Sequence, residues 1–257
     1  MKSGTIVFIH GMYMNSLCWE HWESYFQKNG FKTLAPDWPG RDQSIESLRK
    51  NYLNSQLGEL TLSKIIEHYT NILEKLDEKP IIIGHSMGGL VVQLLHQKDL
   101  AAAGVAIDSA APMGVFSTKW SFLKANWAHI TPFVSQSRPI VMTFERFQYA
   151  FVNGLPMEEQ RAAYDRYVVP ESRRVPRESL TAKVDFKKQK PPLLLVAGSA
   201  DNIIPASLNK SNYNKYKSSS SVTSFKEFPG RTHYIIGQKG WEEVAGYVND
   251  WLNKNQK

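Results

Sequence analysis

The segment Gly84-His85-Ser86-Met87-Gly88-Gly89 constrains the fold of this chain more than any other feature. It follows the continuous apolar run 80–83, which is typical of a strand buried on both faces, and it precedes a helical pattern at 90–97. Glycines are needed where a chain turns so sharply from strand to helix, because no side chain fits beside a serine in a strained conformation. The segment therefore predicts a strand, a sharp turn that presents Ser86, and a helix.

The rest of the sequence repeats this alternation of strands and helices. Further strand-like runs lie at residues 5–9, 32–35, 104–107, 193–196 and 222–228. Between them, the apolar residues of 62–76 follow helical spacing, with Thr61 placed to cap the start, and the segment 241–252 has one apolar helical face. The alternation predicts an α/β fold with a doubly wound, mostly parallel sheet of about six strands.

Residues 113–182 interrupt the alternation, since they contain aromatic side chains but no good buried strand. About 70 residues is too long for an ordinary loop in a compact domain. We therefore expect a core domain formed by residues 1–112 and 183–257, with a helical insertion at 113–182 that forms a small layer of its own.

A serine hydroxyl is a weak nucleophile near neutral pH, so Ser86 needs a histidine base and a carboxylate that orients it. Of the seven histidines, His233 is favoured because it lies in a loop just after the last strand. For the acid, Asp201 follows the strand 193–196, at the edge where open α/β sheets build sites. Asp108, at the end of the strand 104–107, is the alternative.

Acyl transfer also requires hydrogen-bond donors for the oxyanion of the tetrahedral intermediate. The backbone N–H of Met87 is one expected donor. The backbone N–H of Met12 is the second, because Gly11 in the loop after the first strand allows the main chain to approach closely.

The charge pattern argues against a nucleic-acid partner. Lys and Arg outnumber Asp and Glu by 31 to 24, but the excess is spread along the chain. The densest basic runs, 173–177 and 183–190, adjoin prolines, lack the interleaved aromatics of single-strand binding surfaces, and resemble solvated linkers.

Other features predict a cytoplasmic location. The lone Cys18 cannot form an internal disulfide, and we see no signal peptide and no apolar stretch near the roughly 20 residues of a membrane helix. Cys18 lacks an activating context, and we predict a structural role for it.

The sequence resembles the α/β-hydrolase family in several motifs. The resemblance rests on His10-Gly11 and on residues 36–40, 84–89, 198–205 and 230–233, and it spans the chain apart from the insertion. It implies the α/β-hydrolase fold, a cap at 113–182, a triad of Ser86, Asp201 and His233, and no cofactor or metal. Family members usually have two strands before the His-Gly loop; here the first strand begins near Thr5, so the sheet should be reduced.

Ser86 argues against the aspartate-nucleophile dehalogenases and epoxide hydrolases of this family. The leading hypothesis is a serine hydrolase that cleaves a carboxylic ester with a small to medium apolar acyl group through an acyl-enzyme intermediate. Lactonases, amidases, carbon-carbon bond hydrolases and perhydrolases share the constellation, and so do ligand-binding receptors or scaffolds with a slow or vestigial triad. The sequence leaves the oligomeric state open. The candidates for substrate contacts are Tyr13, Met113, Trp120, Trp127, Phe144 and Phe147.

Overall fold

The structure, a computed structural model, describes residues 4–54, 56–130, 134–188, 190–218 and 221–255. Six strands form one sheet in the order β2-β1-β3-β4-β5-β6, and every neighbouring pair is parallel. The strands are β1 (Thr5–Ile9), β2 (Lys32–Leu34), β3 (Ile81–His85), β4 (Ala103–Ile107), β5 (Leu193–Gly198) and β6 (Thr223–Phe228). The predicted parallel sheet of six strands is confirmed.

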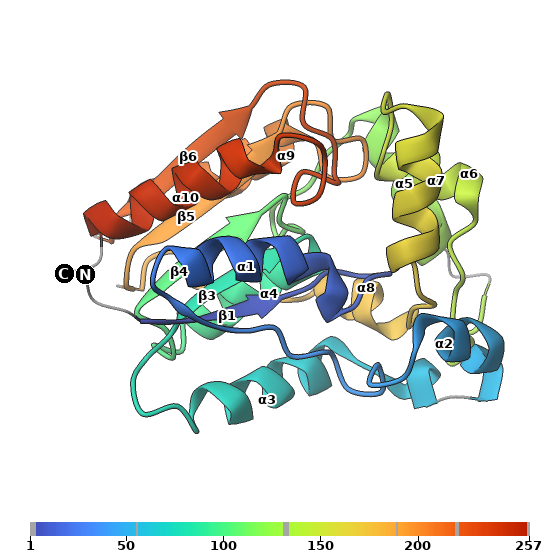
Figure 1. Ribbon diagram of the computed structural model, residues 1–257, viewed down its shortest axis with the longest axis horizontal. Helices are drawn as coiled ribbons and strands as arrows, with labels where there is room; N and C mark the ends of the chain where they lie inside the picture. The colour runs from blue at the N-terminus through green and yellow to red at the C-terminus, as the bar shows by residue number, and fades with distance from the viewer. Residues whose placement is uncertain (1–3, 55, 131–133, 189, 219–220, 256–257) are drawn as a thin grey trace.

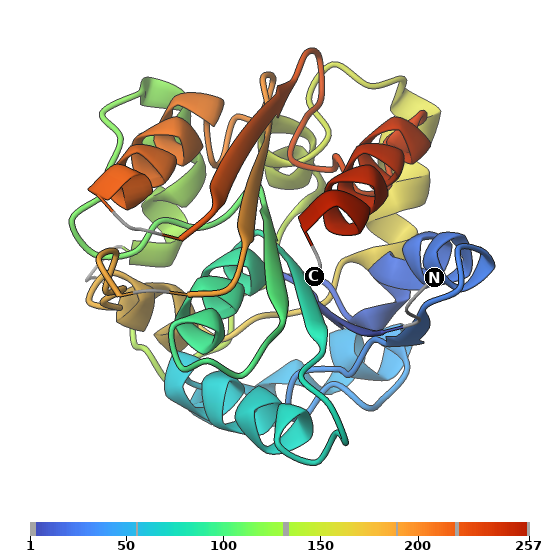
Figure 2. The same cartoon turned by 90° about the vertical axis from the view of Figure 1, so that its left-hand side faces the viewer.

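Helices cover both faces of this sheet. Helices α1 (Glu20–Lys28) and α10 (Trp241–Asn255) lie on one face, and α3 (Leu62–Leu73), α4 (Met87–His96) and α9 (Ala206–Lys215) lie on the other (Figure 2). The chain reverses its direction of winding between β1 and β3, which are neighbours in the sheet. Loops that follow strands on either side of such a reversal diverge, and ligands bind in the crevice between them.

Local sequence explains how the elements form. The side chain of Thr61 accepts a hydrogen bond from the Lys64 N–H at 3.1 Å, so the predicted cap of α3 is present. The central strands β3, β4 and β5 are buried along their whole length, as their continuous apolar runs predicted. The edge strand β6 is only partly buried, which explains its weaker apolar pattern.

Between β4 and β5 the described residues form four helices, which lie beyond the carboxyl ends of the strands (Figure 1). These are α5 (Trp120–Ile130), α6 (Phe144–Ala150), α7 (Met157–Tyr167) and α8 (Arg174–Ser179). An isolated bridge pairs Ile140 with Glu171. The remaining elements are α2 (Ile45–Asn51) and four short 3-10 helices, η1 (Ser16–Trp19), η2 (Tyr52–Asn54), η3 (Gln56–Glu59) and η4 (Tyr216–Ser218).

The basic run 173–177 is not a solvated linker, as the sequence suggested, because it lies mostly within α8. Val175 and Pro176 are buried. Proline is compatible with the first turn of a helix because its missing N–H has no partner there in any case. No helix in the described ranges is long and apolar enough to cross a membrane.

Candidate active site

Ser86 lies in the predicted strained turn between β3 and α4. Its backbone has φ 58° and ψ −121°, a conformation that L-residues rarely adopt. The turn packs against the end of β1 so closely that a Cβ on Gly88 would lie 2.1 Å from the Ile9 carbonyl oxygen. A Cβ on Gly11 would lie 2.7 Å from Ser86 Cβ. The glycines are therefore required on both sides of the contact between the two loops.

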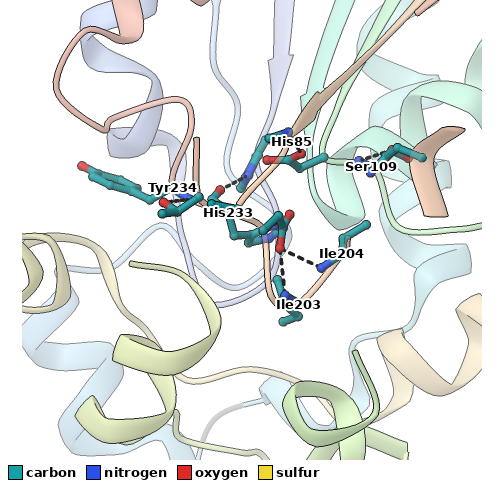
Figure 3. A network of polar contacts seen from close by, with 12 residues as sticks. His85, Ser109, Ile203, Ile204, His233 and Tyr234 are labelled. Carbon is teal, nitrogen blue, oxygen red and sulfur yellow. Dashed lines mark hydrogen bonds and ion pairs between the residues drawn. The ribbon is translucent and has the colours of Figure 1, made fainter. Parts of the chain in front are cut away.

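The side chains of His233 and Asp201 form a buried hydrogen-bonded pair. His233 Nδ1 donates to Asp201 Oδ2 at 2.6 Å, and the Ile203 and Ile204 N–H groups both donate to Asp201 Oδ1 at 2.8 Å (Figure 3). The loop after β5 thus wraps around its own carboxylate and fixes the direction in which the second oxygen points. The carboxylate in turn fixes the imidazole in the tautomer with the proton on Nδ1.

The backbone of His233 is attached to the residue that precedes Ser86. His85 Nε2 donates to the His233 carbonyl oxygen at 2.8 Å, and the centroids of the two imidazoles are 4.7 Å apart (Figure 3). On another side, the ring of Phe151 meets the His233 ring edge to face at 4.7 Å. Within the described part of the chain, His233 Nε2 has no hydrogen-bond partner, Ser86 included. Such bonds are often long in unliganded enzymes, and this nitrogen is able to accept a proton.

Burial controls the charge state of the pair. Burial lowers the pKa of His233, so the imidazole is neutral at pH 7. Burial raises the pKa of Asp201, and this effect is opposed by the Ile204 and Ile203 N–H groups, which stabilise the carboxylate. A neutral imidazole is the form that a general base requires.

Asp108, the alternative acid, does not contact His233 through a hydrogen bond in the described structure. Its Oδ1 accepts the Gly198 N–H at 2.7 Å. Burial and the neighbouring Asp201 raise the pKa of Asp108, partly offset by the Gly198 N–H. The geometry thus pairs His233 with Asp201.

Among the residues that the structure describes, His85, Asp108 and His233 form a group with the spacing of metal ligands, because each offers one ligand atom and these atoms lie within 4.8 Å of one another. Each already has a hydrogen bond to a protein group. These hydrogen bonds occupy His85 Nε2, Asp108 Oδ1 and His233 Nδ1, which is one polar atom of each side chain.

A cavity of about 190 Å³ lies over Ser86 and is lined also by Met12 and Met87, the residues expected to provide oxyanion donors. Ser86 itself is only 7% exposed. The turn therefore presents the serine to this covered cavity rather than to open solvent. Apart from Ser86, Asn126 and Ser179, the lining side chains are apolar or aromatic.

One of the six residues predicted to contact substrate, Tyr13, lies in the wall of this cavity. Trp127 lines a second cavity, whose wall also contains Tyr13, and Met113, Trp120, Phe144 and Phe147 line neither. Trp120 is 75% exposed, and Phe147 is fully buried and stacked on Phe151. The aromatics that line the cavity are instead Phe116, Phe122 and Phe151. Helical periodicity identifies an apolar face but does not tell which neighbour that face meets.

A buried ion pair that no sequence pattern predicted holds the loop after β1. Glu171 lies in the insertion and pairs with Arg41; both side chains are almost completely buried. Glu171 Oε2 also accepts the Tyr13 N–H at 3.1 Å, and Arg41 donates to the Met14 carbonyl oxygen. The Val169 N–H adds a bond to the Tyr13 carbonyl oxygen at 2.9 Å. The insertion and the loop that carries Met12 are therefore fixed to each other.

We expect Glu171→Ala to lower the free energy of unfolding by about 3 to 5 kcal/mol, because Arg41 would remain buried without its counterion. Denaturant unfolding measures this loss. The control is Glu59→Ala, which removes the exposed partner of Arg174 and should cost less than about 1 kcal/mol. Equal losses in the two variants would contradict the role assigned to the pair.

Comparison with known proteins agrees with this architecture. Residues 6–246 match the sequence profile described as "Alpha/beta hydrolase family". The chain is 26% identical to "Putative esterase/lipase 3" of Mycoplasma genitalium over 99% of this chain and 89% of that protein.

Solved structures with similar folds include a monoacylglycerol lipase of Paleococcus ferrophilus, with TM-score 0.67, 22% identity and coverage of 98% of this chain and 95% of that one. Tomato methylketone synthase I aligns with TM-score 0.71 and 13% identity over 99% of this chain and 100% of that one. Polyneuridine aldehyde esterase aligns with TM-score 0.69 and 16% identity over 97% and 99%. At these identities the likeness concerns the fold.

Proposed function

This chain belongs to the alpha/beta hydrolase family, and on that premise we propose that it is a serine hydrolase that cleaves carboxylic esters through an acyl-enzyme intermediate. Its relative named as an esterase/lipase supports the same class of reaction. The observation that carries the proposal is the hydrogen bond between Asp201 and His233 Nδ1. The other ring nitrogen, His233 Nε2, has no partner among the described residues. The His233 carbonyl oxygen is hydrogen bonded to His85, the residue that precedes Ser86.

In the proposed reaction, Ser86 Oγ attacks the ester carbonyl carbon while His233 Nε2 takes the hydroxyl proton. The carbonyl oxygen becomes an oxyanion, which the N–H groups of Met12 and Met87 would stabilise. Collapse of this intermediate breaks the carbon–oxygen bond, and the proton moves from His233 to the departing alcohol. Water then attacks the acyl-enzyme by the same route, which releases the acid and restores Ser86.

The direct test is turnover of 4-nitrophenyl esters combined with covalent labelling by a fluorophosphonate. A hydrolase of this kind releases nitrophenol catalytically and is labelled at Ser86. The alternative of a ligand-binding receptor or scaffold with a vestigial triad requires binding of esters without turnover. Thioesters, lactones and amides in the same assay would rank the other substrate classes.

We further propose that the insertion acts as a cap that selects the acyl group. Its residues Phe116, Phe122 and Phe151 line the cavity over Ser86. Burial of a methylene group contributes about 0.8 kcal/mol, so kcat/KM should rise about fourfold with each added methylene until the cavity is full. Phe122→Ala should move the optimum to longer acyl chains, as measured with a series of 4-nitrophenyl esters.

The matched control is Trp120→Ala, which removes an aromatic from the same helix at a position that does not line the cavity. Its chain-length profile should equal that of the unmodified protein. If Phe122→Ala and Trp120→Ala gave the same profile, the insertion would have no part in acyl selection through Phe122.

A further inference from the structure

A second cavity, of about 360 Å³, adjoins the cavity over Ser86. Tyr13 lines both. Residues that are adjacent in the sequence of the insertion line different cavities. Ala125 and Ala150 line the second cavity, and the residues that follow them, Asn126 and Phe151, line the cavity over Ser86. The two cavities therefore lie side by side, and Tyr13 belongs to the wall of both.

The chemistry of the second cavity differs from that of the first, because basic side chains line it. Lys124 of α5 and Arg146 of α6 both line it, and these two helices contact each other. Lys124 Nζ lies 4.0 Å from the centroid of the Tyr149 ring. Glu145 is the carboxylate in the lining. Hydrogen bonds from its own backbone N–H and from the Thr143 side chain lower the pKa of Glu145, and the charge of Arg161 lowers it further.

Further positive charges lie close enough to interact with Arg146 or its neighbours. Burial lowers the pKa of Arg173, and the charges of Arg177, Arg146 and Arg138 lower it further. Among the described residues, Lys124, Arg138 and Arg146 form no ion pair with a carboxylate, although other exposed cations of this chain do. Like charges close together raise the free energy of the folded protein, and a bound anion would lower it.

We propose that this second cavity binds an anionic group of the substrate, a carboxylate or a phosphate, that is separated by several bonds from the ester held at Ser86. The inference rests on the proposed ester hydrolysis and specifies its substrate class as an ester with a remote negative charge. The apolar part of the substrate fills the cavity over Ser86, and Arg146 and Lys124 hold the charged end beyond Tyr13.

The test compares esters that share a leaving group and differ in the far end of the acyl chain. Mono-4-nitrophenyl adipate carries a carboxylate at that end, and 4-nitrophenyl hexanoate is neutral there. A third ester carries a phosphate in place of the carboxylate. We expect higher kcat/KM for the anionic esters and a decline of that preference with added salt. Preference for phosphate over carboxylate would identify the anion.

Arg146→Gln should lower kcat/KM for the anionic esters about tenfold, the usual scale of a hydrogen bond to a charged group, and leave the neutral ester within twofold. Lys119→Gln is the matched control, since it removes one positive charge from the insertion at a residue that does not line the cavity. Equal losses for neutral and anionic esters in Arg146→Gln would overturn the inference.

A binding measurement separates this inference from the proposed reaction. Monoethyl adipate and neutral diethyl adipate are titrated into the Ser86→Ala protein by calorimetry. We expect tighter binding of the monoester, and loss of that difference when Arg146→Gln is added. Anion-dependent binding without ester turnover by the unmodified protein would contradict the hydrolase and keep the anion site. Ester turnover by the unmodified protein without any binding preference for the monoester would keep the hydrolase and contradict the anion site.

Discussion

Ser86→Ala is expected to lower kcat for ester hydrolysis by about 10⁴ to 10⁶, because it removes the atom that forms the proposed acyl-enzyme. Alanine fits the site without a clash, since it is smaller than serine and keeps the Cβ that already packs on Gly11. The free energy of unfolding should therefore change little. The assay is hydrolysis of a 4-nitrophenyl ester, with fluorophosphonate labelling as a second measurement that should be lost in the same variant.

Residues that act as a unit do not contribute additively. His233→Ala should give a loss similar to that of Ser86→Ala, and the double variant should lose little more. Ser179→Ala is the matched control: Ser179 lines the same cavity, but its hydroxyl donates to the Pro176 carbonyl oxygen at 2.7 Å. If Ser86→Ala retained hydrolysis close to that of Ser179→Ala, Ser86 would not be the nucleophile.

The parts of the fold that follow from local physical chemistry could be predicted from the sequence. Residues 81–84 of β3 are apolar without interruption because helices cover both faces of the sheet at that point. The turn at Ser86 could be predicted because only glycine tolerates the approach of the Ile9 carbonyl oxygen at position 88. In both cases the local residues and their immediate neighbours decide the structure.

Long-range contacts could not be predicted in this way. Arg41 and Glu171 are 130 residues apart, and a single arginine and a single glutamate in a sequence give no indication that they are paired and buried. Phe147 and Phe151 lie one helical turn apart, yet only Phe151 lines the cavity over Ser86. That difference depends on how α6 is oriented over the core, which one amphipathic pattern does not specify.

The two buried aspartates near His233, Asp201 and Asp108, are expected to differ in how much kcat falls when each is replaced by asparagine. Asp201→Asn is expected to lower kcat by up to about 10⁴. The Ile203 and Ile204 N–H groups donate to Asp201 Oδ1, and an asparagine must keep its carbonyl oxygen there to accept them. Its NH₂ group would then face His233 Nδ1. Two donors cannot hydrogen bond to each other, so the imidazole would change to the tautomer with its proton on Nε2, which cannot accept the proton of Ser86.

Asp108→Asn is the matched control, because it makes the same change at a buried carboxyl close to the same histidine. No hydrogen bond joins Asp108 to His233 in the described structure, and the Asn carbonyl oxygen can still accept the Gly198 N–H. The loss of kcat should therefore be less than about tenfold, with the fold preserved in both variants as judged by circular dichroism and unfolding midpoint.

The comparison of these two variants decides which carboxylate orients the base. A pH profile adds a measurement that a loss of stability would not change: the residual activity of Asp201→Asn should increase with pH as hydroxide replaces the missing general base, whereas Asp108→Asn should keep the profile of the unmodified protein. A large loss in Asp108→Asn with a mild loss in Asp201→Asn would assign the acid to the end of β4. The 2.6 Å bond between Asp201 and His233 would then be a structural contact, and His233 would need to turn toward Asp108 before it could accept a proton.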